Sequence, residues 1–344
     1  MKVGLIGRQG AGKTTVFNML TGLEAQVGGY GRKDEVHLGV IKVPDSRVDR
    51  LAQIFKPKKT TYADIRFTDF PPRPADDNAK ANAALLGQMR DVDAMALILG
   101  GFEPGAEPIK ELDALVTEMI LADLAVVENR RARLKKEKGR PQEEALLERC
   151  AHALENEESL RNLTFSSDEE NLLAGFGFLS RKPVLVLFNH PDDMAGQPLS
   201  PEKQKALQKR GLQGLAIAAR VEMEIAQLDE EDRAAFLKDI GIPEAARDRF
   251  IRACYRLLDL ISFFTTGEDE VRAWTVSQGT HARKAAGKIH SDIERGFIRA
   301  EVMAYEDFIG CGSEAKCKEA GKLRLEGKDY VVQDGDIIHF RFAI

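Results

Sequence analysis

The sequence contains one short run of residues whose types and spacing suit the binding of phosphate. Residues 7–14 match the pattern G-x-x-x-x-G-K-[ST] of a phosphate-binding loop. The apolar run at residues 3–6 predicts a buried strand before this P-loop, and residues 15–20 predict a helix after it. Strand, glycine-rich turn and helix form the context that the motif requires. The predicted phosphate-binding residues are Gly7, Arg8, Gln9, Gly10, Ala11, Gly12, Lys13, Thr14 and Thr15.

The residue types in the loop each have an expected role. We expect Gly7, Gly10 and Gly12 to adopt left-handed backbone angles and to let the chain approach a phosphate closely. The helix that follows points its N-terminal N–H groups at the same anion. Lys13 is expected to reach the β- and γ-phosphates, and the Thr14 hydroxyl to bind Mg²⁺. A solvated lysine in an ordinary glycine-rich turn does not explain this joint spacing.

The elements that must position the loop follow an alternating order of strands and helices. Strand-like apolar runs alternate with helical stretches up to about residue 115, and the strands resume at residue 183. This order predicts an α/β fold with a doubly wound, mostly parallel sheet in a nucleotide-binding domain of residues 1–265. The predicted strands lie at residues 3–6, 36–43, 63–69, 94–99, 183–188 and 214–218, and the predicted helices at residues 47–55 and 79–88.

Residues 118–170 interrupt this domain with a different pattern. Two charged segments with apolar residues at helical spacing are separated by a break at residues 138–141. They predict an inserted antiparallel coiled-coil arm; the alternative is a pair of surface helices packed on the sheet. The seam residues are Ile120, Leu124, Val127, Arg131 and Leu134 on the first helix and Leu147, Cys150 and Leu154 on the second.

The C-terminal residues 266–344 predict a separate α+β module. Strand-like runs lie at residues 271–276, 329–332 and 335–342, and a helix is expected at residues 282–289. One helix over a mixed sheet is the simplest arrangement of these elements.

Composition and charge limit the class of protein. The chain has 344 residues, of which 43% are hydrophobic and 31% charged, and its net charge of −5 provides no general attraction to nucleic acid or anionic lipid. It contains no run of about 18 apolar residues, so we expect a cytoplasmic protein that neither spans a membrane nor is secreted. Its four cysteines fit no metal-binding spacing. Cys311 and Cys317 lie in a glycine-rich segment that is expected to be exposed, where they are candidates for redox sensitivity.

Short motifs at positions 43–45, 120–124, 270–275, 296–301, 321–328 and 332–336 complete the pattern. Together with the P-loop, the arm and the C-terminal module, they resemble the YchF subfamily of Obg-like ATPases, which are P-loop NTPases. The resemblance covers nearly the whole chain and implies that the last module is a β-grasp TGS domain, linked in such proteins to ribosome or RNA contact. It also implies ATP or GTP and Mg²⁺ as ligands.

The second phosphate-site motif of such proteins, D-x-x-G, is altered in this chain. Asp69 stands at the end of its predicted strand, where it is expected to polarise the hydration shell of Mg²⁺. Pro72 occupies the glycine position, and proline has no N–H to donate to the γ-phosphate. Lys13 and Asp69 are thus the candidate catalytic residues, and Thr14 and Asp69 the candidate metal ligands. Lys33 replaces the expected threonine of the first switch region, either to neutralise phosphate charge or as a solvated loop residue.

The resemblance also implies a base-recognition site. Asn189, His190 and Asp192 follow a predicted strand, where GTPases have N-K-x-D and YchF relatives have N-x-x-E. The Asp192 side chain has the length that GTPases use to accept hydrogen bonds from guanine, whereas the resemblance to YchF relatives implies that ATP is the ligand. We expect both nucleotides to bind, with the preference open. Ala218, Ala219 and Arg220 follow the last strand and are expected to contact the base.

Two functions fit these residues. The first is a slow Mg²⁺-dependent NTPase acting with the ribosome; the second is a nucleotide-binding scaffold or sensor with little hydrolysis and no γ-phosphate switch. We expect ribosome or RNA contact through the arm and the C-terminal module, whose basic residues suit rRNA phosphates, and the sequence leaves the oligomeric state open. In that module Trp274 and Phe297 either stack on bases or fill the core. The basic residues are Arg272, Arg283, Lys284, Lys288, Arg295 and Arg299.

Overall fold

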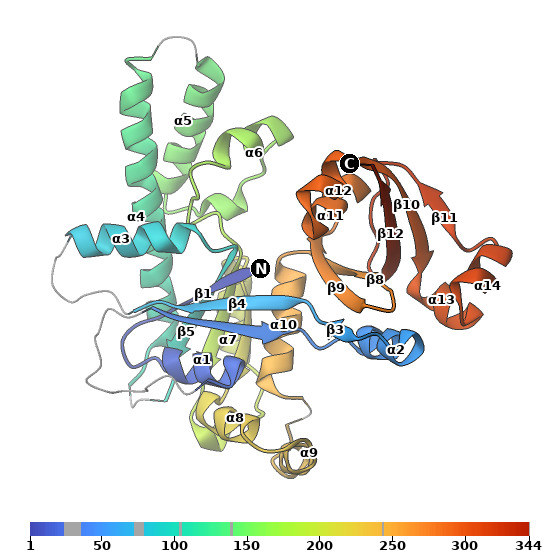
Figure 1. Ribbon diagram of the computed structural model, residues 1–344. Helices are drawn as coiled ribbons and strands as arrows, with labels where there is room; N and C mark the ends of the chain where they lie inside the picture. The colour runs from blue at the N-terminus through green and yellow to red at the C-terminus, as the bar shows by residue number, and fades with distance from the viewer. Residues whose placement is uncertain (24–35, 72–78, 103–104, 138–139, 243, 344) are drawn as a thin grey trace. The chain divides into compact units, whose positions relative to one another are not determined.

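The chain folds into two compact units, each built from two segments of the sequence (Figure 1). The computed structural model describes residues 1–23, 36–71, 79–102, 105–137, 140–242 and 244–343. The first unit comprises Met1–Val40 and Arg66–Phe250, and the second comprises Ile41–Ile65 and Ile251–Ile344. No helix in these ranges is long and apolar enough to cross a membrane.

The first unit is built on a six-stranded sheet in the order β2-β4-β1-β5-β6-β7. Strand β1 pairs in parallel with β4 and β5, and β5, β6 and β7 continue in parallel. All six residues of β6 are buried, as expected for a strand covered on both faces. The strands are β1 (Lys2–Ile6), β2 (His37–Lys42), β4 (Asp64–Asp69), β5 (Ala94–Gly100), β6 (Val184–Asn189) and β7 (Gln213–Ile217).

Helices cover this sheet, which confirms the predicted α/β fold. Met89, Leu115 and Leu207, from three different helices, pack in one core with the side chains of β1, β5 and β6. On another part of the sheet, Phe67 of β4 packs against Phe250. The helices of the unit are α1 (Lys13–Thr21), α3 (Ala79–Arg90), α4 (Pro108–Leu134), α5 (Pro141–Glu155), α6 (Ser167–Leu173), α7 (Pro201–Lys209), α8 (Ala219–Ala226), α9 (Glu230–Asp239) and the start of α10 (Ala246–Leu257), with short 3₁₀ turns at Leu160–Asn162 and Asp192–Met194.

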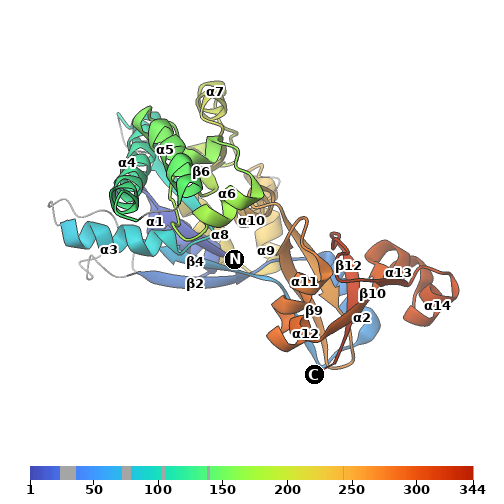
Figure 2. The same ribbon diagram turned by 90° about the horizontal axis from the view of Figure 1, so that it is seen from above.

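The predicted arm is formed by α4 and α5, which lie side by side and antiparallel (Figures 1 and 2). The N-terminal part of α4 packs on the sheet through Leu112 and Leu115. Its C-terminal part joins a separate core with α5, in which Val127 and Cys150 are fully buried. One helix therefore serves both as a layer over the sheet and as one side of the arm.

The second unit is a β-grasp fold with a six-stranded mixed sheet in the order β11-β10-β12-β8-β9-β3. Strands β8 and β9 form an antiparallel pair, β12 runs parallel to β8, and β10 runs antiparallel to β12. Helix α11 packs on this sheet through Ala282 and Ala285, whereas α13 and α14 lie together at the other end of the unit (Figures 1 and 2). Its elements are α2 (Ser46–Phe55), β3 (Lys59–Thr61), β8 (Leu260–Thr265), β9 (Glu270–Ser277), α11 (Ala282–Ile289), α12 (Ser291–Arg295), β10 (Phe297–Ala304), α13 (Tyr305–Cys311), α14 (Glu314–Glu319), β11 (Arg324–Glu326) and β12 (Asp336–Phe342).

The segment Ile41–Ile65 belongs to the second unit, although it lies between two strands of the first. Strand β3 pairs in parallel with β9. The Arg47 guanidinium donates to Asp334 Oδ2 over 2.7 Å and to Asp45 Oδ2 over 2.8 Å. The division between the two compact units therefore differs from the expected boundary at residue 265, because residues 41–65 and 251–265 pack with the C-terminal module.

Two predictions about the C-terminal module are wrong. Residues 329–332 form no strand: Val331 makes an isolated bridge with His281, and the Val332 N–H donates to the Thr280 carbonyl. Cys317 is fully buried rather than exposed, because its glycine-flanked segment folds into α13 and α14, and burial raises the pKa of this thiol to about 11. Cys311 is half-buried.

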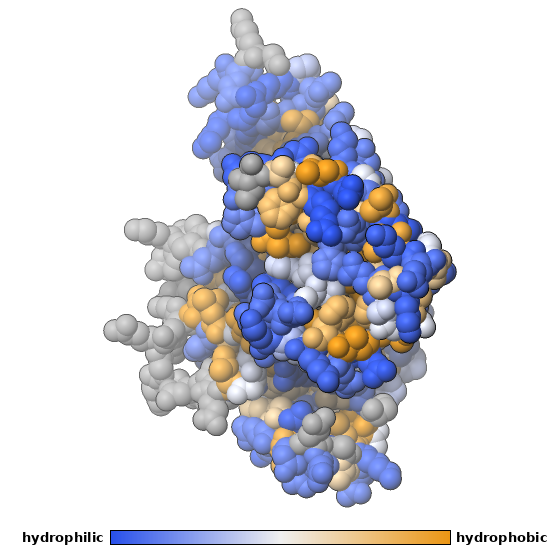
Figure 3. All heavy atoms as spheres, turned by 45° about the vertical axis from the view of Figure 1, so that its right-hand side comes forward, coloured by the Kyte–Doolittle hydropathy of each residue, from blue (hydrophilic) through white to orange (hydrophobic). Residues whose placement is uncertain are grey.

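The two aromatic residues considered for base stacking pack into the second unit. Trp274 and Phe297 lie against its buried core. The Trp274 indole N–H donates to Thr265 Oγ1 over 3.0 Å, and the Arg272 guanidinium lies over the indole ring. This packing against the core agrees with the alternative in which the two rings fill the core. Figure 3 shows hydrophobic and hydrophilic side chains interspersed over one face of the molecule.

Candidate functional site

The carboxyl ends of the parallel strands bring the predicted site residues of the first unit together. The P-loop follows β1, Asp69 ends β4, Gly100 ends β5 and Asn189 ends β6. This edge of an open α/β sheet, next to the strand where the order of connection reverses, is where such folds bind ligands.

The P-loop has the backbone that its glycines predict, with one difference. Gly10 and Gly12 have φ angles of 84° and 85°, in the left-handed region. Gly7 is required for another reason: a Cβ at this position would collide with the carbonyl oxygen of Ile98. The expectation of a left-handed Gly7 is therefore wrong, and its close approach to β5 is what excludes a side chain.

Lys13 is the first residue of α1, and its side chain contacts the P-loop. Its side chain is buried, and Nζ donates to the Arg8 carbonyl over 3.2 Å. Burial lowers the pKa of Lys13, while the charges of Asp69 and Glu111 act in the opposite direction. Glu111 was not predicted as a site residue; it accepts a long bond from the Arg8 N–H, and its own pKa is raised by burial.

The second predicted constellation, Thr14 and Asp69, is present. Thr14 Oγ1 donates to Asp69 Oδ2 over 3.2 Å, and Asp69 is only 4% exposed. Burial raises the pKa of Asp69, opposed by Lys13, Thr14 and His37. The other oxygen of this carboxylate, Oδ1, is buried and has no hydrogen-bond partner among the residues that the structure describes.

These oxygen atoms suit a magnesium ion. Mg²⁺ is usually held by one or two protein oxygen ligands together with water and substrate phosphates, rather than by a cage of protein side chains. Thr14 Oγ1 and the unpartnered oxygen of Asp69 provide such ligands beside the P-loop. Within the described ranges, no group of three or more acidic, histidine or cysteine residues forms an alternative metal site.

Asn189 links three segments of the site. Its Nδ2 donates to the Ala11 carbonyl in the P-loop over 3.2 Å, and its Oδ1 accepts from the Ala219 N–H over 3.1 Å. The predicted residues of the base site, Ala218 and Ala219, therefore stand next to Asn189 at the start of α8. A Cβ on Gly12 would collide with the Asn189 amide, so the glycine and the asparagine fit each other.

The remaining base-site residues differ in exposure. Asp192 lies 3.7 Å from Arg220, and both side chains are exposed, at 48% and 74%. His190 is buried, and its Nε2 lies 2.9 Å from Lys203 Nζ, so the neutral ring accepts from the ammonium. Burial, and then the charge of Lys203, lower the pKa of His190. Lys203 is 13 residues away in sequence, and no motif pointed to it.

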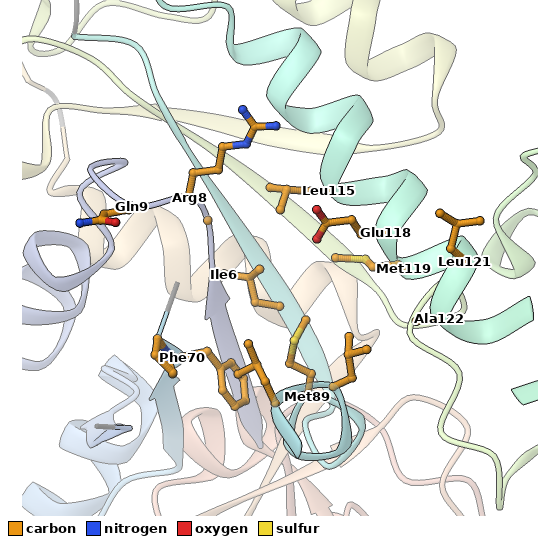
Figure 4. A pocket seen from close by; sticks show the side chains of 14 residues that line it. Ile6, Arg8, Gln9, Phe70, Met89, Leu115, Glu118, Met119, Leu121 and Ala122 are labelled. Carbon is orange, nitrogen blue, oxygen red and sulfur yellow. The ribbon is translucent and has the colours of Figure 1, made fainter. Parts of the chain in front are cut away.

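Arg8 and Gln9 also border two cavities beside the P-loop. The larger, of about 670 Å³, is lined mainly by apolar residues of α3 and α4, together with Ile6, Phe70 and the charged Glu118 (Figure 4). The smaller, of about 390 Å³, is bordered by Gly10, Ala11, Phe102 and Glu111, among others. Of the altered switch residues, Lys33 and Pro72 lie outside the described residues.

Comparisons with known proteins cover the whole chain. Residues 260–343 match the family model YchF-GTPase_C, described as "Protein of unknown function (DUF933)". The "Ribosome-binding ATPase YchF" of Bacillus subtilis is 36% identical over 364 residues, which cover 100% of both chains. The protein of the same name from Pasteurella multocida is 38% identical over 360 residues, covering 100% of this chain and 99% of that one.

A solved structure is similar over nearly the full length. The YchF GTPase of Schizosaccharomyces pombe superposes with a TM-score of 0.85 at 28% identity, covering 99% of this chain and 97% of the yeast chain. The match therefore includes the sheet, the arm and the β-grasp unit. With full-length relatives at 36% and 38% identity, the chain belongs to the YchF family.

Proposed function

We propose that this chain is a P-loop NTPase that binds a purine nucleotide, ATP or GTP, with Mg²⁺ and hydrolyses it slowly in association with the ribosome. The observation that carries the proposal is the convergence of Lys13, Thr14 and Asp69 around one P-loop. The names of full-length relatives, which describe ribosome-binding ATPases, support the partner and the reaction. Action with the ribosome would take place in the cytoplasm.

The protein's contribution to hydrolysis is positioning and electrostatics. The N–H groups of the P-loop and the first turn of α1 hold the phosphates. Lys13, which now donates to a neutral carbonyl, gains a stronger charge-assisted bond by turning to a phosphate oxygen. Thr14 and Asp69 would hold Mg²⁺, which when bound neutralises charge on the β- and γ-phosphate oxygens. Glu111 holds the start of the loop through a long hydrogen bond from the Arg8 N–H.

Base recognition in this proposal depends on Asn189 and Asp192. Asn189 is engaged with the P-loop and with α8, so it acts by shaping the pocket. Asp192 is exposed, and its carboxylate can accept from the N–H groups of guanine once Arg220 moves aside. ATP lacks these donors but keeps every phosphate contact, so both nucleotides are expected to bind.

Single-turnover hydrolysis with a Lys13→Ala variant tests the enzymatic function. We expect phosphate release by the unaltered protein to depend on Mg²⁺ and to fall by roughly 10²–10³-fold in Lys13→Ala, because one preorganised charge is lost at the transferring phosphoryl group. Lys205→Ala, on the exposed side of α7, is the matched control and should leave the rate unchanged. Tight nucleotide binding without Lys13-dependent release would instead favour the scaffold or sensor function.

A further inference from the structure

His37 lies against the acidic residue of the proposed magnesium site, although no motif pointed to it. It is the first residue of β2, and its Nδ1 lies 3.5 Å from Asp69 Oδ2. Its ring also packs against Phe17 of α1, with ring centroids 6.0 Å apart. The Nδ1 atom is buried, and its 3.5 Å contact with Asp69 is longer than an ordinary hydrogen bond; no other described residue gives it a hydrogen-bond partner. The side chain thus carries a buried polar atom toward one carboxylate.

The two oxygens of Asp69 have different surroundings. Oδ2 faces Thr14 Oγ1 at 3.2 Å and His37 Nδ1 at 3.5 Å, from two different elements. Oδ1 is buried and unpartnered among the described residues. A buried carboxylate oxygen without a partner is costly, so this atom is the one that a ligand would satisfy. Contacts on Oδ2 from two directions fix the rotation of the carboxylate and keep Oδ1 available.

We infer that His37 is a positioning residue for Mg²⁺: its Nδ1–H closes the 3.5 Å gap to a hydrogen bond with Asp69 Oδ2 when the cation binds, and leaves Oδ1 as the acceptor for the cation and its hydration shell. The inference rests on the proposed function, because it assumes a magnesium site at Thr14 and Asp69. Carboxylates that act at metal sites are commonly held by such neighbouring hydrogen bonds, and the loss of one typically lowers the affinity for the metal by about 10–100-fold.

A purely structural role for His37 makes a different prediction. If the ring only fills space between β2 and Phe17, then phenylalanine can replace it and asparagine cannot. If Nδ1 is what matters, the order is reversed, because the amide of asparagine places a donor close to the position of Nδ1 while lacking the ring. His37→Phe and His37→Asn therefore separate packing from polar contact.

The test measures metal affinity without hydrolysis. Mn²⁺ binding to the full-length protein saturated with ADP is followed by the electron paramagnetic resonance signal of free Mn²⁺, and ADP binding is measured separately in EDTA. We expect His37→Phe to lower the affinity for Mn²⁺ by about tenfold or more, and the affinity of His37→Asn to stay within about threefold of that of the unaltered protein. ADP affinity in EDTA should not change. His37→Leu is a second variant without a ring nitrogen, for use if phenylalanine does not fold beside Phe17.

Two results would overturn the inference alone. One is an unchanged Mn²⁺ affinity in the folded variants without a ring nitrogen; the other is an asparagine variant as defective as the phenylalanine variant. A failure of the proposed function looks different, because the unaltered protein would then bind no ADP in EDTA or no Mn²⁺ with ADP, and the inference would fall with it.

Discussion

The residues at the P-loop site are of two kinds: buried side chains that the fold holds in place, and exposed side chains that can move to meet a ligand. Lys13, Asp69 and Asn189 are buried and held by named partners, so the fold fixes their positions. Asp192 and Arg220 are exposed and lie 3.7 Å apart, so their pairing is worth little by itself. The choice between purine bases is therefore the property most easily changed by a single substitution.

Asp192→Ala should reduce the affinity for GDP by about 10–100-fold and change that for ADP by less than threefold. The reason is that guanine loses a charged acceptor for two N–H groups, an interaction worth about 1.5–3 kcal/mol, whereas adenine loses none. Calorimetric titration with both diphosphates measures the two effects. Asp193→Ala, the exposed neighbour, is the control. Equal losses for the two nucleotides would show that Asp192 does not read the base.

At the scale of elements, a buried carboxylate joins the arm to the nucleotide-binding unit. Asp123 of α4 is 0% exposed and accepts from the N–H groups of Leu179 and Ser180 over 3.0 and 2.7 Å. Its Oδ1 also accepts from Arg90, the last residue of α3, over 2.8 Å. The helix that follows the Asp69 strand is thus anchored at the base of the arm.

Asp123→Ala should lower the free energy of unfolding by about 3–5 kcal/mol, because it removes the carboxylate partner of a largely buried guanidinium and leaves two buried N–H groups without their acceptor. Asp113→Ala is a matched control on the same helix: its carboxylate bonds Arg210, but it is 52% exposed, so the loss should be about 1 kcal/mol or less. Urea unfolding followed by circular dichroism compares them. Similar losses in both variants would contradict the anchoring role of Asp123.

Local sequence signals predicted the first unit well, because its strands are apolar runs and its P-loop is a contiguous motif. They missed β3, which is three residues long, and could not show that residues 41–65 pack with the C-terminal module. That assignment depends on contacts such as Arg47 with Asp334, which are 287 residues apart. His37 and Lys203 were missed for the same reason, since their partners are defined by the folded sheet rather than by spacing.

At the scale of the whole molecule, the chain passes from the first unit to the second through β2 and returns through β4. Those two strands also carry His37 and Asp69, so the chain leads directly from the proposed nucleotide site into the segment that completes the β-grasp unit. Much of the predicted basic patch of that unit is paired with carboxylates. Lys284 contacts Glu294 and Arg295 contacts Asp292, and Arg299 likewise contacts Glu301.

Ribosome binding through the C-terminal unit should weaken as salt rises. Phosphate contacts release counterions, so co-sedimentation with ribosomes should fall clearly between about 50 and 200 mM salt. The double variant Arg283→Glu/Lys288→Glu, on the exposed side of α11, should reduce it further, whereas Lys205→Glu/Lys209→Glu on α7 should not. Ribosome binding that changes neither with salt nor in either double variant would count against RNA phosphate as the partner.

Calorimetric titration with a non-hydrolysable ATP analogue and Mg²⁺ shows whether Lys13, Thr14 and Asp69 form a site for a nucleoside triphosphate. We expect one site per chain, with affinity reduced at least tenfold in Lys13→Ala and on removal of Mg²⁺, because both remove positive charge from the phosphates. An affinity that is the same in the unaltered protein, in Lys13→Ala and in EDTA would show that these residues do not bind the triphosphate.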